Sequence, residues 1–224
     1  MSTQIVNLAH SLVQFILMII TLIIGVKYFK HLKELNHFVL IPLIGIIQYS
    51  FTSISKSYLD DKTYQEGSDL IIKIYVVIEF IVFVFFYTRQ TPNSIVKNIL
   101  TSFSIVFLTY FIVNVIIENN YLNKYYYVFT SIEAFIIISF SLNLYIHLIF
   151  DDTIKNFKDS PPFLINTSLF FFFTYTFPFY FFDFFLTAKL PTFFVLNKAI
   201  NGMAYIIFYL LLIKSLRCKI KLSK

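Results

Sequence analysis

Residues 70–87, LIIKIYVVIEFIVFVFFY, contain only two charged side chains, Lys73 and Glu79, and are otherwise apolar or aromatic. Apolar side chains follow one another here without alternation, over about the length that an α-helix needs to cross the hydrocarbon core of a bilayer. Similar runs recur from one end of the chain to the other. Because they are continuous and about twice as long as a membrane β-strand requires, they exclude a β-barrel and predict transmembrane α-helices.

The composition of the whole chain agrees with this interpretation. Of its 224 residues, 58% are apolar and 13% charged, and the mean hydropathy is +0.76, whereas soluble domains carry about 25% charged residues. The longest polar stretch, residues 56–69, is too short to fold into a soluble catalytic or nucleotide-binding domain. Any function must therefore reside in the helices.

We predict an all-α membrane protein with a single domain over residues 1–224. It is expected to be a seven-transmembrane-helix bundle whose N-terminus lies outside and whose C-terminus is cytoplasmic. The expected spans cover residues 5–26, 38–55, 70–87, 99–117, 125–149, 163–186 and 193–213.

The orientation rests on the distribution of Lys and Arg in the short loops, because such loops stay in the cytoplasm when they are basic. Twelve basic residues fall on one side and four on the other: Lys27, Lys30, Lys33, Arg89, Lys97, Lys155, Lys158, Lys214, Arg217, Lys219, Lys221 and Lys224 against Lys56, Lys62, Lys124 and Lys189. The basic tail is expected to contact anionic lipid headgroups, not nucleic acid. With 30 Phe, 16 Tyr and no Trp, the composition suggests an AT-rich bacterial genome and hence the bacterial cytoplasmic (inner) membrane.

Polar side chains within the predicted spans are concentrated in their outer halves. Asn7, His10, Ser11 and Gln14, for example, share one face of the first span through i, i+3, i+4, i+7 spacing. Such residues are costly in a bilayer and mark functional sites, so we expect an outward-facing polar pocket. Its candidate residues are His10, Gln14, Gln48, Tyr75, Glu79, Asn114, Glu133, Asp183, Asn197, Lys198 and Asn201. The alternative is that these groups only bond neighbouring helices to each other.

Charge balance leads to a further expectation about these candidates. Lys198 is the one cation near three acidic side chains, Glu79, Glu133 and Asp183. We expect it to pair with one of them, and at least one of Glu79 and Glu133 to be neutral. Alternatively, Lys198 extends to the outer headgroups.

Motifs of common catalytic and cofactor sites are missing from the sequence. There is no G-x-S-x-G elbow, Gly-rich phosphate loop or H-E-x-x-H helix. His10 and His147 lie near opposite membrane faces, which argues against a metal site. Phe194 stands four residues before Lys198, where microbial rhodopsins have Asp, and this argues against retinal. We expect no cofactor and no metal; intramembrane catalysis by Glu79 with Glu133 is a minority hypothesis.

Three stretches carry a resemblance to a known group. These are Ile74 to Phe80 (IYVVIEF), Phe163 to Leu169 (FLINTSL), and the span containing Asn201 with its basic tail around Cys218. Here the chain resembles small, uncharacterised seven-transmembrane-helix bacterial inner-membrane proteins. The resemblance implies the seven-helix architecture and importance for Glu79 and Asn166, but it implies no activity.

The leading hypothesis is a receptor- or sensor-like membrane protein that binds a small ligand or lipid from outside. Because the cytoplasmic loops are short, its signal would require a separate signalling protein as partner. The runner-up is an oligomeric channel or membrane-perturbing effector. The apolar inner halves of the spans argue against a pore through one copy, whereas a pore formed by an oligomer escapes this objection.

Overall fold

A computed structural model describes residues 2–29, 33–58, 61–91, 93–117, 122–150, 160–186 and 191–222. Side chains are described for 11–29, 35–52, 58, 67, 70–91, 93–113, 128–150, 160–179, 181–182 and 199–218. The described chain is all-helical, as predicted. Its elements are α1 (Ser2–Lys27), the 3₁₀-helix η1 (Lys33–Val39), α3 (Leu40–Tyr58), α4 (Asp61–Gln90), α5 (Ser94–Ile117), α6 (Leu122–Phe150), α7 (Pro161–Leu186) and α8 (Pro191–Leu222).

Five helical segments within the described residues are long and apolar enough to cross a bilayer. They are Leu35–Thr52, Leu70–Gln90, Ser94–Val113, Val128–Phe150 and Ala199–Cys218. The chain is therefore a multi-pass helical membrane protein. The apolar part of α1, Ser11–Lys27, is shorter, and α7 is not among the five, so the first and sixth predicted spans stay predictions.

The helices extend beyond the predicted spans, most of all α4, which begins at Asp61 and not near residue 70. Hydropathy indicates the part of a helix that suits hydrocarbon, whereas the helix itself ends where its backbone is capped. At the start of α5, Asn93 Oδ1 accepts hydrogen bonds from the backbone N–H of Ile95 at 3.0 Å and of Val96 at 3.3 Å. Such a cap satisfies donors that the first turn leaves unpaired.

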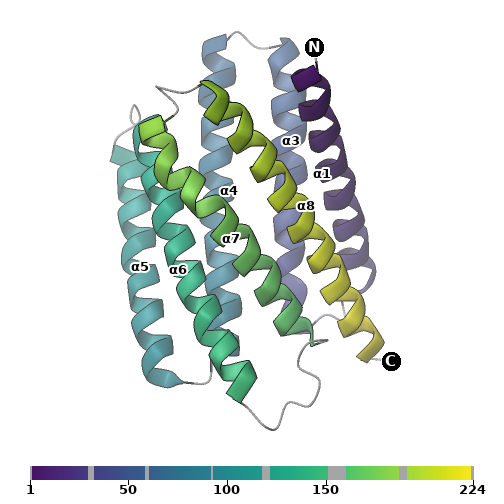
Figure 1. Cartoon of the computed structure of the whole chain (residues 1–224), viewed down its shortest axis with the longest axis vertical. Helices are drawn as coiled ribbons and strands as arrows, with labels where there is room; N and C mark the ends of the chain where they lie inside the picture. The colour runs from purple at the N-terminus through teal and green to yellow at the C-terminus, as the bar shows by residue number, and fades with distance from the viewer. Residues whose placement is uncertain are drawn as a thin grey trace.

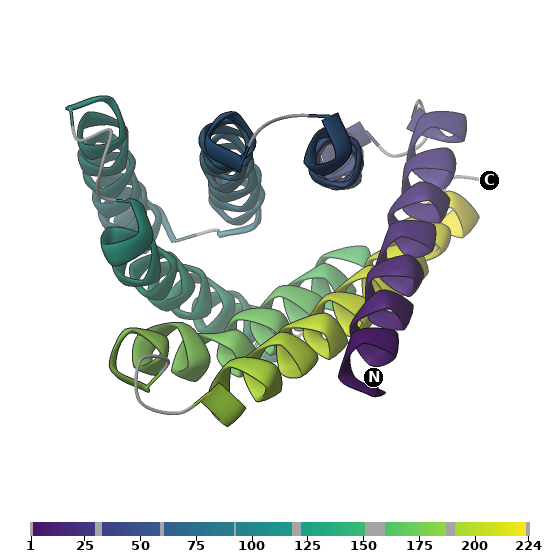
Figure 2. The same cartoon turned by 90° about the horizontal axis from the view of Figure 1, so that it is seen from above.

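Consecutive α-helices run in opposite directions, so α1 begins and α8 finishes at opposite ends of the bundle (Figure 1). Seen from above, α3 and α4 face α7 and α8, with α1 on one flank and α5 and α6 on the other (Figure 2). Contacts run from α1 to α3, α4, α6, α7, α8 and back to α1. Six helices thus form a closed ring, and α5 packs outside it against α4 and α6.

Aromatic side chains fill the middle of this ring in the half toward the end of α8. Phe83 of α4 is fully buried, and its ring centroid lies 5.7 Å from that of Phe173 on α7 and 6.4 Å from that of Phe208 on α8. Both pairs are edge-to-face, an arrangement that aromatic rings prefer. The interior of the ring of helices is therefore occupied by aromatic side chains at this level.

Candidate functional site

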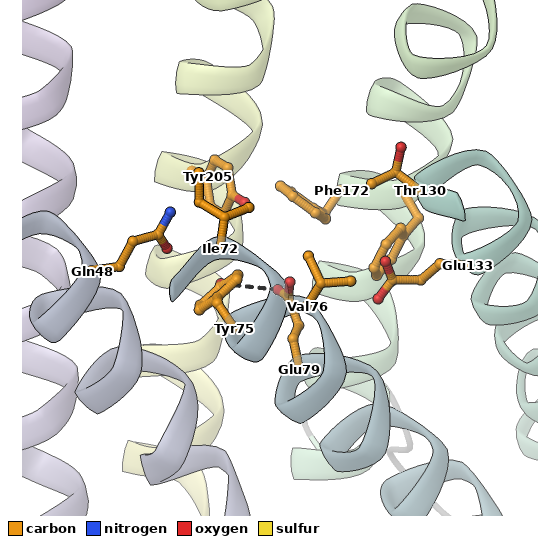
Figure 3. A pocket seen from close by; sticks show the side chains of 10 residues that line it. Gln48, Ile72, Tyr75, Val76, Glu79, Thr130, Glu133, Phe172 and Tyr205 are labelled. Carbon is orange, nitrogen blue, oxygen red and sulfur yellow. Dashed lines mark hydrogen bonds between the residues drawn. The ribbon is translucent and has the colours of Figure 1, made fainter. Parts of the chain in front are cut away.

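A cavity of about 60 Å³ lies between α3, α4, α6, α7 and α8 (Figure 3). Four of its ten lining residues are apolar: Ile72, Val76, Phe172 and Phe173. The other six carry hydrogen-bonding groups: Gln48, Tyr75, Glu79, Thr130, Glu133 and Tyr205. It is therefore a polar site enclosed by a largely apolar bundle.

The cavity wall on α4 follows directly from helical periodicity. Ile72, Tyr75, Val76 and Glu79 are spaced i, i+3, i+4 and i+7, which places them on one face of the helix. Thr130 and Glu133 are three residues apart on α6 and share a face in the same way. The packing of α4 against α6 then brings the two glutamates to one cavity.

The two carboxyl groups are both buried but differ in their hydrogen bonding. Glu79 is 7% exposed, and its Oε1 accepts a hydrogen bond of 3.1 Å from the Tyr75 hydroxyl. Glu133 is 3% exposed, and its Oε1 has no hydrogen-bond partner among the described residues. Both side chains extend from their helices toward the same space (Figure 3). Among the described residues that line this cavity there is no Lys or Arg.

A second cavity of about 180 Å³ adjoins the first, since Gln48, Tyr75 and Tyr205 line both. Its remaining lining residues come from α1 and α3: Gln14, Met18, Gly45, Tyr49 and Thr52. The two cavities together extend from α1, across the interior, to α6.

The structure brings several predicted site residues together. Gln48, Tyr75, Glu79 and Glu133 line the first cavity, and Gln14 lines the second. Asn201, one turn before Tyr205 on α8, is in neither lining set. The remaining five have side chains outside the described residues: His10, Asn114, Asp183, Asn197 and Lys198. Their place in the pocket, including the expected ion pair of Lys198, stays a prediction.

Some lining residues are not among the pocket candidates that the sequence predicts. Thr130 and Tyr205 belong to the polar clusters of their spans, one helical turn from Glu133 and Asn201, but only Glu133 and Asn201 are candidates. Phe172 and Phe173 belong to a run of four phenylalanines, in which no pattern marks the pair that faces inward. Lys73 has no predicted role. Its side chain on α4 is nevertheless only 7% exposed, and it is not among the residues that line the cavity.

Some polar side chains of the bundle bond helices together, as the structural alternative proposed. Gln14 Nε2 donates a hydrogen bond of 3.1 Å to the backbone carbonyl of Gly202, joining α1 to α8. At the other end of the bundle, the Ser215 hydroxyl of α8 donates to the Pro161 carbonyl of α7 at 3.1 Å. Gln14 therefore has a structural role even though it lines a cavity.

The lining groups of the first cavity are hydrogen-bonding groups of several kinds. Among the residues that the structure describes, no group of three or more His, Cys, Asp and Glu side chains is placed to hold a metal ion. Two carboxyls, an amide and three hydroxyls are instead able to hydrogen-bond or neutralise a small polar ligand.

Comparison of the chain with protein-family models, curated proteins and solved structures finds no match.

Proposed function

We propose that this is a receptor- or sensor-like membrane protein that binds a small ligand or lipid in an outward-facing pocket and signals through a separate partner protein. The observation that carries the proposal is Glu133, a buried carboxyl group whose Oε1 lacks a described hydrogen-bond partner while facing a polar cavity. Leaving such an oxygen desolvated and unpaired costs about 1–3 kcal/mol or more. A bound ligand that supplies the missing donor would recover this cost.

The proposed topology has seven spans, with the N-terminus outside and the C-terminus in the cytoplasm of a bacterial inner membrane. The ends of α1 and α8 nearest the two termini lie at opposite ends of the bundle (Figure 1), which supports an odd number of crossings. Lys27, Arg89 and Lys97 lie at helix ends on the same side as the end of α8, in agreement with the positive-inside rule. Gln14, Tyr75 and Glu133 lie at or only slightly outside the midpoints of α1, α4 and α6, so the outward opening of the cavities is part of this proposal.

Transmission of a signal would use α4. Tyr75, in the wall of both cavities, lies twelve residues before Tyr87, about 18 Å along a helix with a rise of 1.5 Å per residue. Tyr87 is hydrogen-bonded to Asn166 on α7. A ligand that moves α4 at the cavity would therefore change the packing of α4 against α7 near the cytoplasmic side, where a partner protein would bind.

An oligomeric channel or membrane-perturbing effector is the competing proposal. The packed aromatic side chains around Phe83 leave no passage through a single copy at that level. A channel would therefore require a pore between copies of the chain. The copies would meet through exposed apolar faces such as that of α5, where Ile99 and Val106 are exposed. The exposed surface of α5 also carries the polar side chains of Asn98, Ser102 and Thr109, which would have to supply the polar lining that an ion pathway requires.

Two measurements on the purified full chain distinguish these functions. Thermal melts in detergent are recorded with a panel of alkylamines, short carboxylates, alcohols, amino acids, sugars and lysolipids, and ion flux is measured from proteoliposomes. A receptor gives a saturable rise in melting temperature with one class and no flux. Ion flux without a ligand-dependent rise in melting temperature favours the channel. If no compound in the panel raises the melting temperature, the receptor proposal is contradicted.

A further inference from the structure

We propose that the ligand is a small organic cation whose ammonium group binds between Glu79 and Glu133. This inference rests on the proposed function and specifies the chemical class that the site would accept. Three independent features carry it: the charge of the site, its aromatic wall and its division into two cavities.

The charge of the site selects for cations. Glu79 and Glu133 are nearly fully buried on neighbouring helices, and no described Lys or Arg lines their cavity. If both were ionised, the two carboxylates would repel each other strongly in a medium of low dielectric constant, so without a cation at least one of them is expected to be neutral. A cation between them removes this repulsion, whereas an anion would add to it. An ammonium N–H also provides the donor that Glu133 Oε1 lacks in the described structure.

Glu79 is already oriented for this role. The Tyr75 hydroxyl, one turn earlier on α4, donates to its Oε1 at 3.1 Å. This bond holds the carboxyl group in place and leaves other lone pairs available, because a carboxylate has about four acceptor sites. The ammonium would therefore meet one positioned carboxyl group on α4 and one with an unused acceptor on α6.

The aromatic wall favours an organic ammonium over a metal ion. Tyr75, Phe172 and Tyr205 line the cavity from three different helices (Figure 3), and the ring centroids of Phe172 and Tyr205 are 4.6 Å apart. Aromatic faces attract ammonium ions and also accommodate the hydrocarbon attached to them. A divalent metal ion instead requires several oxygen or nitrogen ligands, and the described residues form no such group.

The division of the site sets the shape of the ligand. The cavity of about 60 Å³ that holds both carboxyl groups accepts a head group, and the adjoining cavity of about 180 Å³ accepts a short body. Met18 and Tyr49 contribute apolar surface to the larger cavity. Gln48, which lines both, is placed to hydrogen-bond the ligand where the two meet.

The test uses n-butylamine as the cationic probe, with 1-butanol and butyrate as probes of similar length but different charge. Thermal melts and calorimetric titrations are performed on the full chain in detergent at neutral pH. We expect butylamine to raise the melting temperature saturably and the other two to have no effect. Glu133→Gln should weaken butylamine binding roughly 10- to 100-fold, the effect of losing one charge-assisted hydrogen bond, and Ser139→Ala on the same helix should leave it unchanged. The Ser139 hydroxyl donates a hydrogen bond within its own helix, to the Phe135 carbonyl at 2.8 Å.

Two further variants keep the test decisive. If Glu133→Gln does not fold, Glu133→Asp keeps the charge but withdraws the carboxyl group by one methylene, and weaker butylamine binding is again expected. Lys198→Met tests whether the chain's own ammonium occupies the site. Butylamine binding to this variant but not to the unaltered protein would overturn the proposal.

The remaining outcomes separate this inference from the proposed function. Saturable binding of 1-butanol or butyrate, unaffected by Glu133→Gln, means that the pocket binds a ligand that is not a cation, which overturns only the inference. An equal response to sodium or calcium chloride at matched ionic strength means an inorganic cation, and likewise overturns it. If the whole panel of ligand classes gives no response, the proposed function fails as well.

Discussion

The Tyr87 hydroxyl of α4 donates a hydrogen bond of 2.9 Å to Asn166 Oδ1 of α7, and both residues are fully buried. The Ser141 hydroxyl of α6 donates to the same oxygen at 2.8 Å, and Asn166 Nδ2 donates to the Ser141 carbonyl at 3.1 Å. A single amide thus connects three helices. Polar groups in lipid associate helices in this way because water does not compete for their hydrogen bonds.

Replacing this amide should destabilise the bundle more than removing one of its partners. Asn166→Leu leaves the Tyr87 hydroxyl and the Ser141 carbonyl without their partner, and leaves the Ser141 hydroxyl only its 3.5 Å contact with the backbone carbonyl of residue 166. It is expected to cost about 1–3 kcal/mol of unfolding free energy. Tyr87→Phe removes one donor while Ser141 still bonds the amide oxygen, so about 0.5–1 kcal/mol is expected. Denaturant titrations in detergent measure both. The control is Tyr175→Phe, because this side chain of α7 is 57% exposed. If Asn166→Leu lowers the free energy of unfolding no more than this control does, the prediction is contradicted.

Two glycines should respond in opposite directions to alanine. A Cβ on Gly25 of α1 would lie 2.5 Å from Cγ2 and 3.4 Å from Cβ of Val39, a β-branched side chain that has little freedom to move. The overpacking is expected to cost about 1–3 kcal/mol, more than the gain of about 1 kcal/mol in helix propensity.

A Cβ on Gly67 of α4 would instead lie 2.9 Å from Phe51 Cζ, the far end of a side chain that is able to tilt away. Gly67→Ala should therefore be neutral or stabilising by up to about 1 kcal/mol. Melting temperatures of the two variants in one detergent compare them directly. A Gly25→Ala protein as stable as Gly67→Ala would show that α1 does not approach η1 as closely as described.

The proposed orientation makes a prediction about labelling in intact bacterial cells. In a Cys218→Ala background, which removes the one cysteine, Tyr58→Cys at the end of α3 should react with an impermeant thiol reagent. Ile95→Cys at the start of α5 should not react until the membrane is permeabilised. Both positions are well exposed, at 84% and 69%, so accessibility within the protein does not explain a difference. The reverse pattern would show that the N-terminus is cytoplasmic.

The membrane class and the positions of the helices were predictable from the sequence, because they depend on local properties. Uninterrupted apolar runs such as residues 70–87 suit hydrocarbon and force the backbone to bond within its own helix. The spacing of Tyr75 and Glu79 by four residues was likewise sufficient to place them on one face, where the structure joins them by a hydrogen bond. The helix ends were less predictable, as the early start of α4 shows, because polar residues also form helix beyond the hydrocarbon.

Only the tertiary structure decided which faces meet. The sequence predicts that Gln14 is a pocket residue. In the structure its side-chain amide also donates a hydrogen bond to the Gly202 carbonyl, 188 residues away. The sequence predicted that Glu79 and Glu133 share a pocket, and both line one cavity in the structure, but no pattern in the sequence indicated that α5 packs outside the ring. Helical periodicity specifies the direction of a side chain relative to its own axis, but which helices become neighbours depends on how side chains of very different sequence position fit together. That fit is decided by packing shape over the whole bundle.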